Sequence, residues 1–420
     1  MKNTIILLLS TLLFASQGIA QDSLLIEKII SNCYPLQLSS EGQLSGKGFD
    51  LLDRAAEQSP FFLIGEAHGV AEIPLFTAAL FDAFKKHGYR YFATETGPYT
   101  ARFLEDLSRQ KDWAEQLETF FQIYPWSIPF YSWQEEGEIL ETVMENSTEE
   151  IRLLWGLDQE FAASFRMHFN DLQKRAKTSE SKAMATKYYD QAMLAFKTSS
   201  ESRNPSDAFM AQIKKDDFEV LKQAFTGQED GLDLLRELEE SIHIYQLWFQ
   251  RKGYTSNALR AEMMKQHFWQ YYRKAKANGG DPKVMFKLGA NHTYRGANAL
   301  NVFDIGNFVS ELASQMNKKS FHLYILSKRG TVNAHTPFSA SEADKQKPYN
   351  APDYFSEMDV SSLLVASPDT TWSVVNLLPI RKALFNRSLK DVDPGLAKLI
   401  WSYDAILVIP EVSAATYYND

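Results

Sequence analysis

The sequence predicts an α/β protein with a central, mainly parallel sheet flanked by helices, and with a large helical insertion. Three observations support this fold class. Before residue 160, short apolar segments typical of buried strands alternate with segments of helical periodicity. The strand pattern returns after residue 280, and residues 160–280 contain no segment typical of a strand. Strands that alternate with helices favour a parallel sheet covered on both faces.

The individual elements follow from the same periodicities. In the first part of the chain we expect strands at 61–64, 91–94 and 153–155 and helices at Ile73–His87 and Tyr99–Leu107. In the second part, apolar runs predict strands at the following positions: 284–288, 323–326, 373–378 and 405–409. A stretch with several prolines and many small polar residues predicts a long loop over 330–360.

These patterns divide the chain into four segments. They are a signal peptide (1–20), the first part of an α/β catalytic domain (21–159), a helical insertion (160–280) and the second part of the catalytic domain (281–420). The first part begins with a short leader and a helix before its first strand. The insertion is rich in Lys, Glu, Gln and Ala, and we expect that it could cap a site on the sheet as a lid.

The first twenty residues have the pattern of a secretory signal. Lys2 provides a positive start, an apolar run covers Ile5–Phe14, and Gly18 and Ala20 offer small residues for cleavage. The apolar run is too short to span a bilayer, and no second run approaches the required length. We therefore expect a secreted or periplasmic protein without a stable membrane span. The alternative is an uncleaved N-terminal anchor.

Composition excludes some classes of function. The net charge is −9, which makes a nucleic acid an unfavourable partner. The single cysteine, Cys33, cannot form an internal disulfide, and no basic neighbour is present to activate its thiol, so we interpret it as structural. Aromatic residues make up 13% of the chain, which suits either a large core or an aromatic pocket. The oligomeric state is not indicated.

Polar side chains gather directly after the predicted strands. Because ligands of open α/β sheets bind beyond the carboxyl ends of the strands, these residues are the first candidates for a site. In chain order they are Glu66, His68, Glu72, Glu95, Asp158, Glu160, Asn291 and His292. A sheet could bring carboxylates and imidazoles from these separate positions to one edge.

The residue types point to general acid–base chemistry. A neutral imidazole with a carboxylate partner can deprotonate water near neutral pH, and His68 is the favoured base. Glu66 lies two residues away and could point to the same side. Glu95 could hold the imidazole or bind water, and His292 could protonate a leaving oxygen or stabilise an oxyanion. These four residues are the candidate catalytic set.

Each residue also has a simpler interpretation. Glu95 could be an acidic residue that favours the N-terminus of the next helix, and Asp158 could cap a helix. Glu72 and Arg102 could be ordinary surface charges. His68 alone would be interpreted as a capping or core histidine.

Other chemistries find less support. No Gly-x-Ser-x-Gly elbow is present, and no glycine-rich phosphate loop follows the first strand. A metal site is the second interpretation, because the imidazoles and carboxylates are competent ligands, but no His-Glu-x-x-His helix occurs. We expect no cofactor, with a divalent metal or haem as the alternative.

At these residues the sequence resembles the erythromycin esterase-like family. The resemblance is scattered between about residues 61 and 409, in short motifs that are specific as a set and weak singly. The motifs are Phe62–Gly69, Phe92–Gly97, Trp155–Asp158, Arg260 with Met263, Lys283–Gly296 and Tyr403–Val408. The resemblance implies a hydrolase that opens lactones with a histidine-activated water, with His68 as base and Glu66, Glu95 and His292 around it. We add Glu72, Asp158, Asn291 and Arg260 as expected substrate-binding residues.

Two positions depart from that family's pattern. The esterases usually have two residues between the first Glu and His, whereas only Ala67 stands between Glu66 and His68. They also tend to have a histidine three residues before the one matched by His292, where this chain has Gly289. The shorter spacing is similar to a related group that includes ChaN-like haem-binding lipoproteins and metal-dependent TIKI-type proteases.

The expected function is therefore a secreted hydrolase of ester-like bonds, including lactones, acting on a small molecule. The alternatives are a haem- or metal-binding protein, a metal-dependent peptidase on the same scaffold, or a non-catalytic member that only binds a partner.

Overall fold

The structure is a computed structural model, and it confirms an α/β fold with a central, mostly parallel sheet flanked by helices. It describes residues 23–145, 147, 151–334, 345–355 and 358–418. The predicted signal peptide lies outside the described residues. No helix within these ranges is long and apolar enough to cross a membrane.

The central sheet has nine strands in the order β1-β10-β11-β8-β4-β7-β5-β6, with β9 paired to β8. Every pair from β11 to β6 is parallel, whereas β1–β10, β10–β11 and β8–β9 are antiparallel. The strands, in chain order, are β1 (Cys33–Pro35), β4 (Phe61–Glu66), β5 (Tyr89–Thr94), β6 (Leu154–Gly156), β7 (Lys283–Gly289), β8 (Phe321–Asn333), β9 (Gln346–Asn350), β10 (Ser373–Asn376) and β11 (Ala405–Val412). Two short strands, β2 (Gln37–Leu38) and β3 (Leu44–Ser45), form a separate pair.

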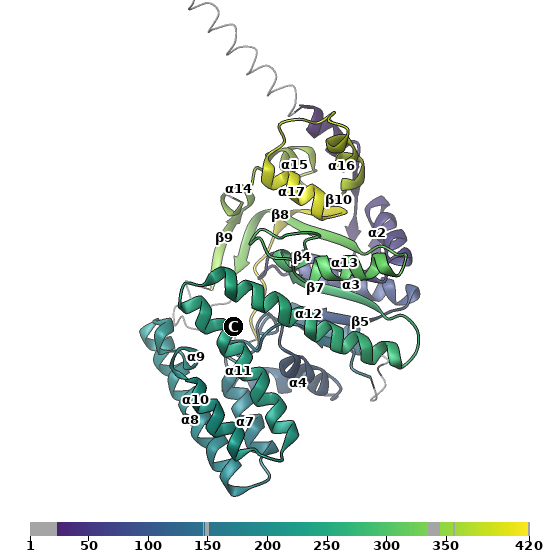
Figure 1. The fold of residues 1–420 in the computed structure, drawn as a ribbon. Coiled ribbons are helices and arrows are strands. Elements are labelled where there is room, and N and C mark those ends of the chain that lie inside the picture. Colours follow the sequence, from purple (N-terminus) through teal and green to yellow (C-terminus); the bar gives the residue numbers. More distant parts are fainter. Residues whose placement is uncertain (1–22, 146, 148–150, 335–344, 356–357, 419–420) are drawn as a thin grey trace, which may run out of the picture.

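Helices cover both faces of the sheet, as Figure 1 shows. Successive residues of a buried strand point to opposite faces, and β4 illustrates this. The Phe61 ring packs against Phe268 of α12 (Gly253–Ala277) at 5.7 Å, whereas the Phe62 ring packs against Phe84 of α3 (Glu72–Phe84) at 5.0 Å. The whole of β4 is buried, which explains its continuous apolar run.

The remaining helices connect and cover these strands. Around the first strands they are α2 (Lys47–Gln58), α4 (Pro98–Ser108), α5 (Trp113–Ile123) and α6 (Gln134–Met144). After β7 they are α13 (Ile305–Gln315), α14 (Ala351–Tyr354), α15 (Ser361–Ala366), α16 (Leu377–Phe385) and α17 (Pro394–Ser402). Short 3₁₀ turns occur at Lys85–His87, Pro205–Asp207 and Ala290–Thr293.

Between β6 and β7 the described chain is helical. A first group comprises α7 (Phe165–Arg175), α8 (Ser179–Ser202), α9 (Phe209–Gln212), α10 (Lys215–Ala224) and α11 (Glu229–Phe249). These helices share a hydrophobic core of their own and extend to one side of the sheet in Figure 1, whereas α12 returns to pack on the sheet. The division of the chain into a helical insertion and two parts of a catalytic domain stays a prediction, as does the role of the insertion as a lid.

The predicted loop over 330–360 is partly wrong. Strand β8 continues to Asn333 and pairs with β9, with Arg329 opposite Asn350 and Asn333 opposite Gln346. Three of the five β9 residues are polar Gln, Lys and Asn, and four of the five are exposed, so the segment lacks the apolar alternation from which strands are recognised. Residues 335–344 lie outside the described residues.

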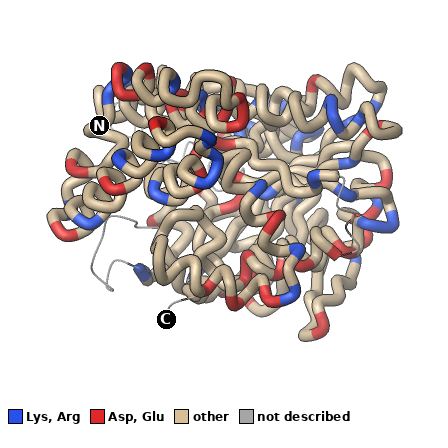
Figure 2. Tube along the Cα trace, turned by 90° about the horizontal axis from the view of Figure 1, so that it is seen from below, with Lys and Arg blue, Asp and Glu red and all other residues tan. Residues whose placement is uncertain are grey.

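Charged residues of both signs are interspersed along the chain in the view of Figure 2. This distribution accompanies the net charge of −9. The expectation that nucleic acid is not a partner stays a prediction.

Candidate active site

The pairing of three parallel strands positions the candidate site. In the register of β4 with β7, Glu66 lies opposite Gly289, and in the register of β5 with β7, Thr94 lies opposite Lys287. The carboxyl ends of these strands therefore meet at one edge of the sheet. Glu95 follows β5 directly, so it reaches the same edge as Glu66.

His68 is held by Glu66 at this edge. Its Nδ1 lies 3.0 Å from Glu66 Oε1, and because an ionised carboxylate only accepts hydrogen bonds, Nδ1 carries the proton. The opposite ring nitrogen, Nε2, faces Glu95 Oε2 at 3.7 Å. The ring stacks on Phe130 with 4.2 Å between centroids, and 32% of the side chain is exposed. The base candidate is thus fixed in tautomer and orientation and still reaches solvent.

Glu95 is the centre of the cluster. Its Oε2 accepts the backbone N–H of Gly289 at 2.5 Å, and its Oε1 accepts a hydrogen bond from Arg260 at 2.8 Å. His292 Nε2 lies 3.4 Å from the same Oε1. Burial acts to raise the pKa of Glu95, but the positive charges of His292, His68 and Arg260 outweigh burial and hold it well below its usual range. Glu95 is therefore an ionised, buried carboxylate, and it does not cap a helix.

Arg260 connects helix α12 to the strand ends. Its Nε and Nη2 donate to the two carboxylate oxygens of Asp158 at 2.7 and 2.5 Å, which is the bidentate geometry favoured by arginine. Nη2 also donates to Glu95. A quarter of the Arg260 side chain is exposed, and its Nη1 makes no hydrogen bond within the described part of the chain.

His292 is a fixed cation at neutral pH. Burial acts to lower its pKa, but Asp304, whose carboxylate lies 2.9 Å from Nδ1, and then Glu95 outweigh burial and raise the pKa of His292 to about 10. The ring is buried, with 8% of the side chain exposed. An imidazole that is protonated at neutral pH can stabilise negative charge, but it cannot act as a base there.

His68 titrates at a higher pH than an ordinary histidine. Burial acts to lower its pKa, and Glu95 and Glu66 together outweigh burial and raise it. The two carboxylates lie on opposite sides of the ring, near Nε2 and Nδ1. A higher pKa makes the neutral ring a stronger base, while reducing the fraction that is neutral at a given pH.

Four neighbours of the cluster were missed by sequence reasoning. Lys287 donates to Glu66 at 2.6 Å and to Glu136 at 2.5 Å, Phe130 stacks on His68, and Asp304 holds His292. The sequence does contain an indication for Lys287, because a lysine within an apolar run predicted as a buried strand requires a buried partner of opposite charge. The others come from α6, a loop and the start of α13, where the local sequence contains no hint of the contact.

Within the described part of the chain, two expected substrate-binding residues make no hydrogen bond or ion pair with the cluster. Both carboxylate oxygens of Glu72 accept the backbone N–H of Ser413 at 3.0 Å, so this side chain ties α3 to the segment after β11. Asn291 is half-buried in the turn after β7, where its carbonyl accepts a hydrogen bond from Asn298. Asp158 and Arg260 do join the cluster.

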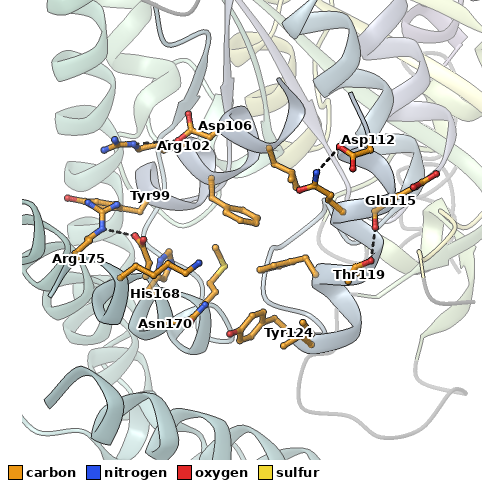
Figure 3. A pocket seen from close by; sticks show the side chains of 18 residues that line it. Tyr99, Arg102, Asp106, Asp112, Glu115, Thr119, Tyr124, His168, Asn170 and Arg175 are labelled. Atoms are coloured by element: carbon orange, nitrogen blue, oxygen red, sulfur yellow. Dashed lines mark hydrogen bonds and ion pairs between the residues drawn. The ribbon is translucent and has the colours of Figure 1, made fainter. Parts of the chain in front are cut away.

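A separate cleft of about 590 Å³ lies between α4, α5 and α7 (Figure 3). Phe103 and Met167 contribute apolar surface, and charged residues such as Asp106 and Arg175 surround it. Arg102 lines this cleft, and its Nε lies 3.8 Å from Asp106 Oδ2. The cleft contains none of the four candidate catalytic residues.

The carboxylates and imidazoles of the cluster are the candidate donors for a metal ion. Within the described ranges, no group of three or more His, Cys, Asp or Glu side chains is arranged to hold a metal ion. The carboxylates of the cluster are already engaged by Lys287, Arg260 and the two imidazoles.

Solved structures share this fold. A mutant of the erythromycin esterase EreC in its open conformation aligns with a TM-score of 0.59 and 15% identity, covering 91% of this chain and 98% of that chain. A succinoglycan biosynthesis protein aligns with a TM-score of 0.57, 15% identity and coverage of 94% and 98%. A Bacillus cereus protein aligns with a TM-score of 0.55, 13% identity and coverage of 94% and 99%. At these identities the likeness shows the fold alone, and it confirms the fold that the resemblance implied.

No family model matches the chain, and no curated protein matches it either.

Gly289→Ala tests how closely the His68 ring packs. A Cβ at this position would lie 2.9 Å from His68 Nε2 and 3.1 Å from Glu95 Oε2, whereas its backbone angles suit any residue. We expect the ring to move away from Glu95, which lowers the pKa of His68, with destabilisation of about 1–3 kcal/mol. Histidine titration by NMR and chemical denaturation measure both effects. Gly253→Ala is the control, because no atom lies within 4 Å of its Cβ. An unchanged His68 titration in Gly289→Ala would contradict the packing.

The protonated state of His292 is testable by NMR titration. We expect a pKa of about 10, falling in Asp304→Asn, which keeps a hydrogen-bond acceptor but removes the charge. Between pH 6.5 and 10 the folded protein retains a proton that the unfolded chain has lost. This group therefore lowers the free energy of unfolding by about 1.4 kcal/mol per pH unit across that interval. Denaturation at several pH values should show a smaller fall in Asp304→Asn, and a His292 titration near that of a free histidine would refute the assignment.

Proposed function

We propose that this protein is a secreted hydrolase that cleaves ester-like bonds, including lactones, in small molecules. The observation that carries the proposal is the placement of His68 between two ionised carboxylates, with part of its ring open to solvent. Secretion rests on the signal-like pattern of residues 1–20. The shared fold with an erythromycin esterase supports the reaction class.

In the proposed reaction His68 acts through Nε2. With Nδ1–H donated to Glu66, Nε2 is the free acceptor and takes a proton from water as the water oxygen attacks the ester carbonyl carbon. The carbonyl oxygen becomes an oxyanion. The carbon–oxygen ester bond then breaks, and the proton on Nε2 passes to the leaving alcohol oxygen, which returns His68 to its neutral form.

The oxyanion requires preorganised positive charge. We assign this role to His292, which is protonated at neutral pH, and to Arg260, whose Nη1 has no partner within the described residues. Asp158 and Glu95 hold Arg260 in a fixed orientation, so the guanidinium does not reorganise as charge develops. Asp158 is thus a positioning residue.

We further propose that the reaction needs no resident metal or haem. Glu66 Oε1 and both carboxylate oxygens of Glu95 already accept hydrogen bonds from Lys287, Arg260 and the Gly289 amide. Protein cations therefore occupy the electrostatic role of a metal in this cluster. Elemental analysis and turnover after chelation test this, and a stoichiometric metal whose removal abolishes turnover would contradict it.

His68→Ala should abolish most of the activity. Loss of a general base costs on the order of 100-fold or more in kcat/KM, and we expect this for esters and lactones in a substrate panel. His292→Ala should also lower kcat, because a charge that stabilises the oxyanion is lost. The matched control is His243→Ala, an exposed histidine on α11.

Circular dichroism and Tm establish that each variant is folded. Wild-type turnover that persists in folded His68→Ala would refute the mechanism. A panel without any turnover that depends on His68 would refute the proposed function itself.

The pH dependence of turnover follows from the raised pKa of His68. Because only the neutral ring accepts a proton and the neighbouring carboxylates raise the pKa of His68, kcat/KM should rise with pH and level off above an apparent pKa higher than 6.5. Initial rates in overlapping buffers at constant ionic strength measure this profile. A rise centred below 6.5 would contradict the assignment of His68 as base.

A further inference from the structure

Two buried charged residues, Lys287 and Glu136, lie next to Glu66, the carboxylate partner of the proposed base. Lys287 on β7 and Glu136 on α6 each have 4% of their side chain exposed, as does Glu66. Lys287 Nζ donates to Glu66 Oε1 at 2.6 Å and to Glu136 Oε1 at 2.5 Å. The ammonium group is therefore held between two buried carboxylates from different elements.

The same oxygen of Glu66 serves both partners. Oε1 accepts from Lys287 Nζ and from His68 Nδ1, so the position of the lysine determines where the imidazole donates its proton. Glu136 fixes the lysine from the opposite side. Neither Lys287 nor Glu136 takes part in the proposed reaction. Burying three charged groups is costly unless they are paired, so their presence here calls for a role.

We propose that Lys287 and Glu136 are positioning residues for the base, holding the Glu66 carboxylate in the place from which it orients His68. This inference rests on the proposed function. Burial acts to raise the pKa of Glu66, and Lys287 and then His68 outweigh burial and lower it, which agrees with an ionised acceptor for Nδ1–H.

Several other groups lie around His68, and the substitutions proposed below leave them unchanged. Glu95 approaches Nε2, and Phe130 covers one face of the ring. Beyond them, the charged and titratable groups around the cluster include Arg260 with Asp158, His292 with Asp304, Tyr131 and Tyr354. Lys287 contacts the Glu66 oxygen that His68 uses, and Glu136 contacts Lys287, so a substitution at Glu136 changes the charge on this side of the imidazole and leaves Glu95 in place.

Glu136→Gln keeps a hydrogen-bond acceptor for Lys287 and removes a negative charge. With less negative charge near the imidazole, His68 should titrate lower by roughly half a pH unit or more, and the acidic limb of kcat/KM should move by the same amount. Glu141→Gln is the matched control, because Glu141 is an exposed residue of the same helix. NMR titration of His68 is independent of turnover.

Lys287→Met tests positioning directly but leaves two buried carboxylates without a cation, which could unfold the protein. The double variant with Lys287→Met and Glu136→Leu removes one charge of each sign, and such replacements are often neutral for stability. We expect the double variant to have a Tm near that of the wild type, with kcat lowered by about tenfold or more and KM little changed. A purely structural role would instead restore kcat together with Tm.

The outcomes separate the two proposals. If His68 shifts in Glu136→Gln but no ester is hydrolysed by the wild type, the positioning is right and the proposed function is wrong. If turnover depends on His68 but neither its titration nor the pH profile moves in Glu136→Gln, the positioning role is overturned and the proposed function stands. Full kcat in the double variant overturns the positioning role as well.

Discussion

The site depends on the parallel pairing of β4, β7 and β5. This pairing places Glu66 opposite Gly289 and ends β5 one residue before Glu95, so that groups more than 190 residues apart in the chain share one edge. A slip of one residue would turn each side chain to the opposite face of the sheet, because side chains alternate along a strand. The buried apolar residues of β4 and β7 fix this register through packing against helices. The geometry of the candidate site is thus a consequence of core packing, and polar contacts then orient its individual side chains.

The pairing of opposite charges in the cluster is the second constraint. Five carboxylates meet three permanent cations and one titrating imidazole in a largely buried space. Glu66 is shared by Lys287 and His68, and Glu95 by Arg260 and His292, so each central carboxylate has a fixed cation and also lies near the titrating ring. This leaves His68 as the group whose protonation state can change most readily near neutral pH. Desolvation would make each charge unfavourable alone, and the alternation of signs offsets that cost.

The sequence predicted the strands well because buried parallel strands are recognisable as apolar runs. It also predicted that Glu66, Glu95 and His292 would follow strand ends, since the rule for open sheets relates position in the chain to position in space. It did not predict Glu136 or Asp304, because their roles arise from tertiary packing of α6 and α13 and have no local pattern. Glu72 shows the reverse error. It follows a strand closely in sequence, but the chain turns into α3 and aims its carboxylate at the Ser413 amide.

The two departures from the esterase pattern form one arrangement. With only Ala67 between them, Glu66 and His68 are close enough to bond through Nδ1, and this places Nε2 beside the backbone of Gly289. A Cβ at position 289 would lie 2.9 Å from Nε2, so a larger side chain there needs the volume that the His68 ring occupies. The glycine at 289 thus leaves room for the His68 ring, while its backbone N–H donates to Glu95. A histidine placed at 289 without lengthening the Glu66–His68 segment would displace the base from the carboxylate it faces.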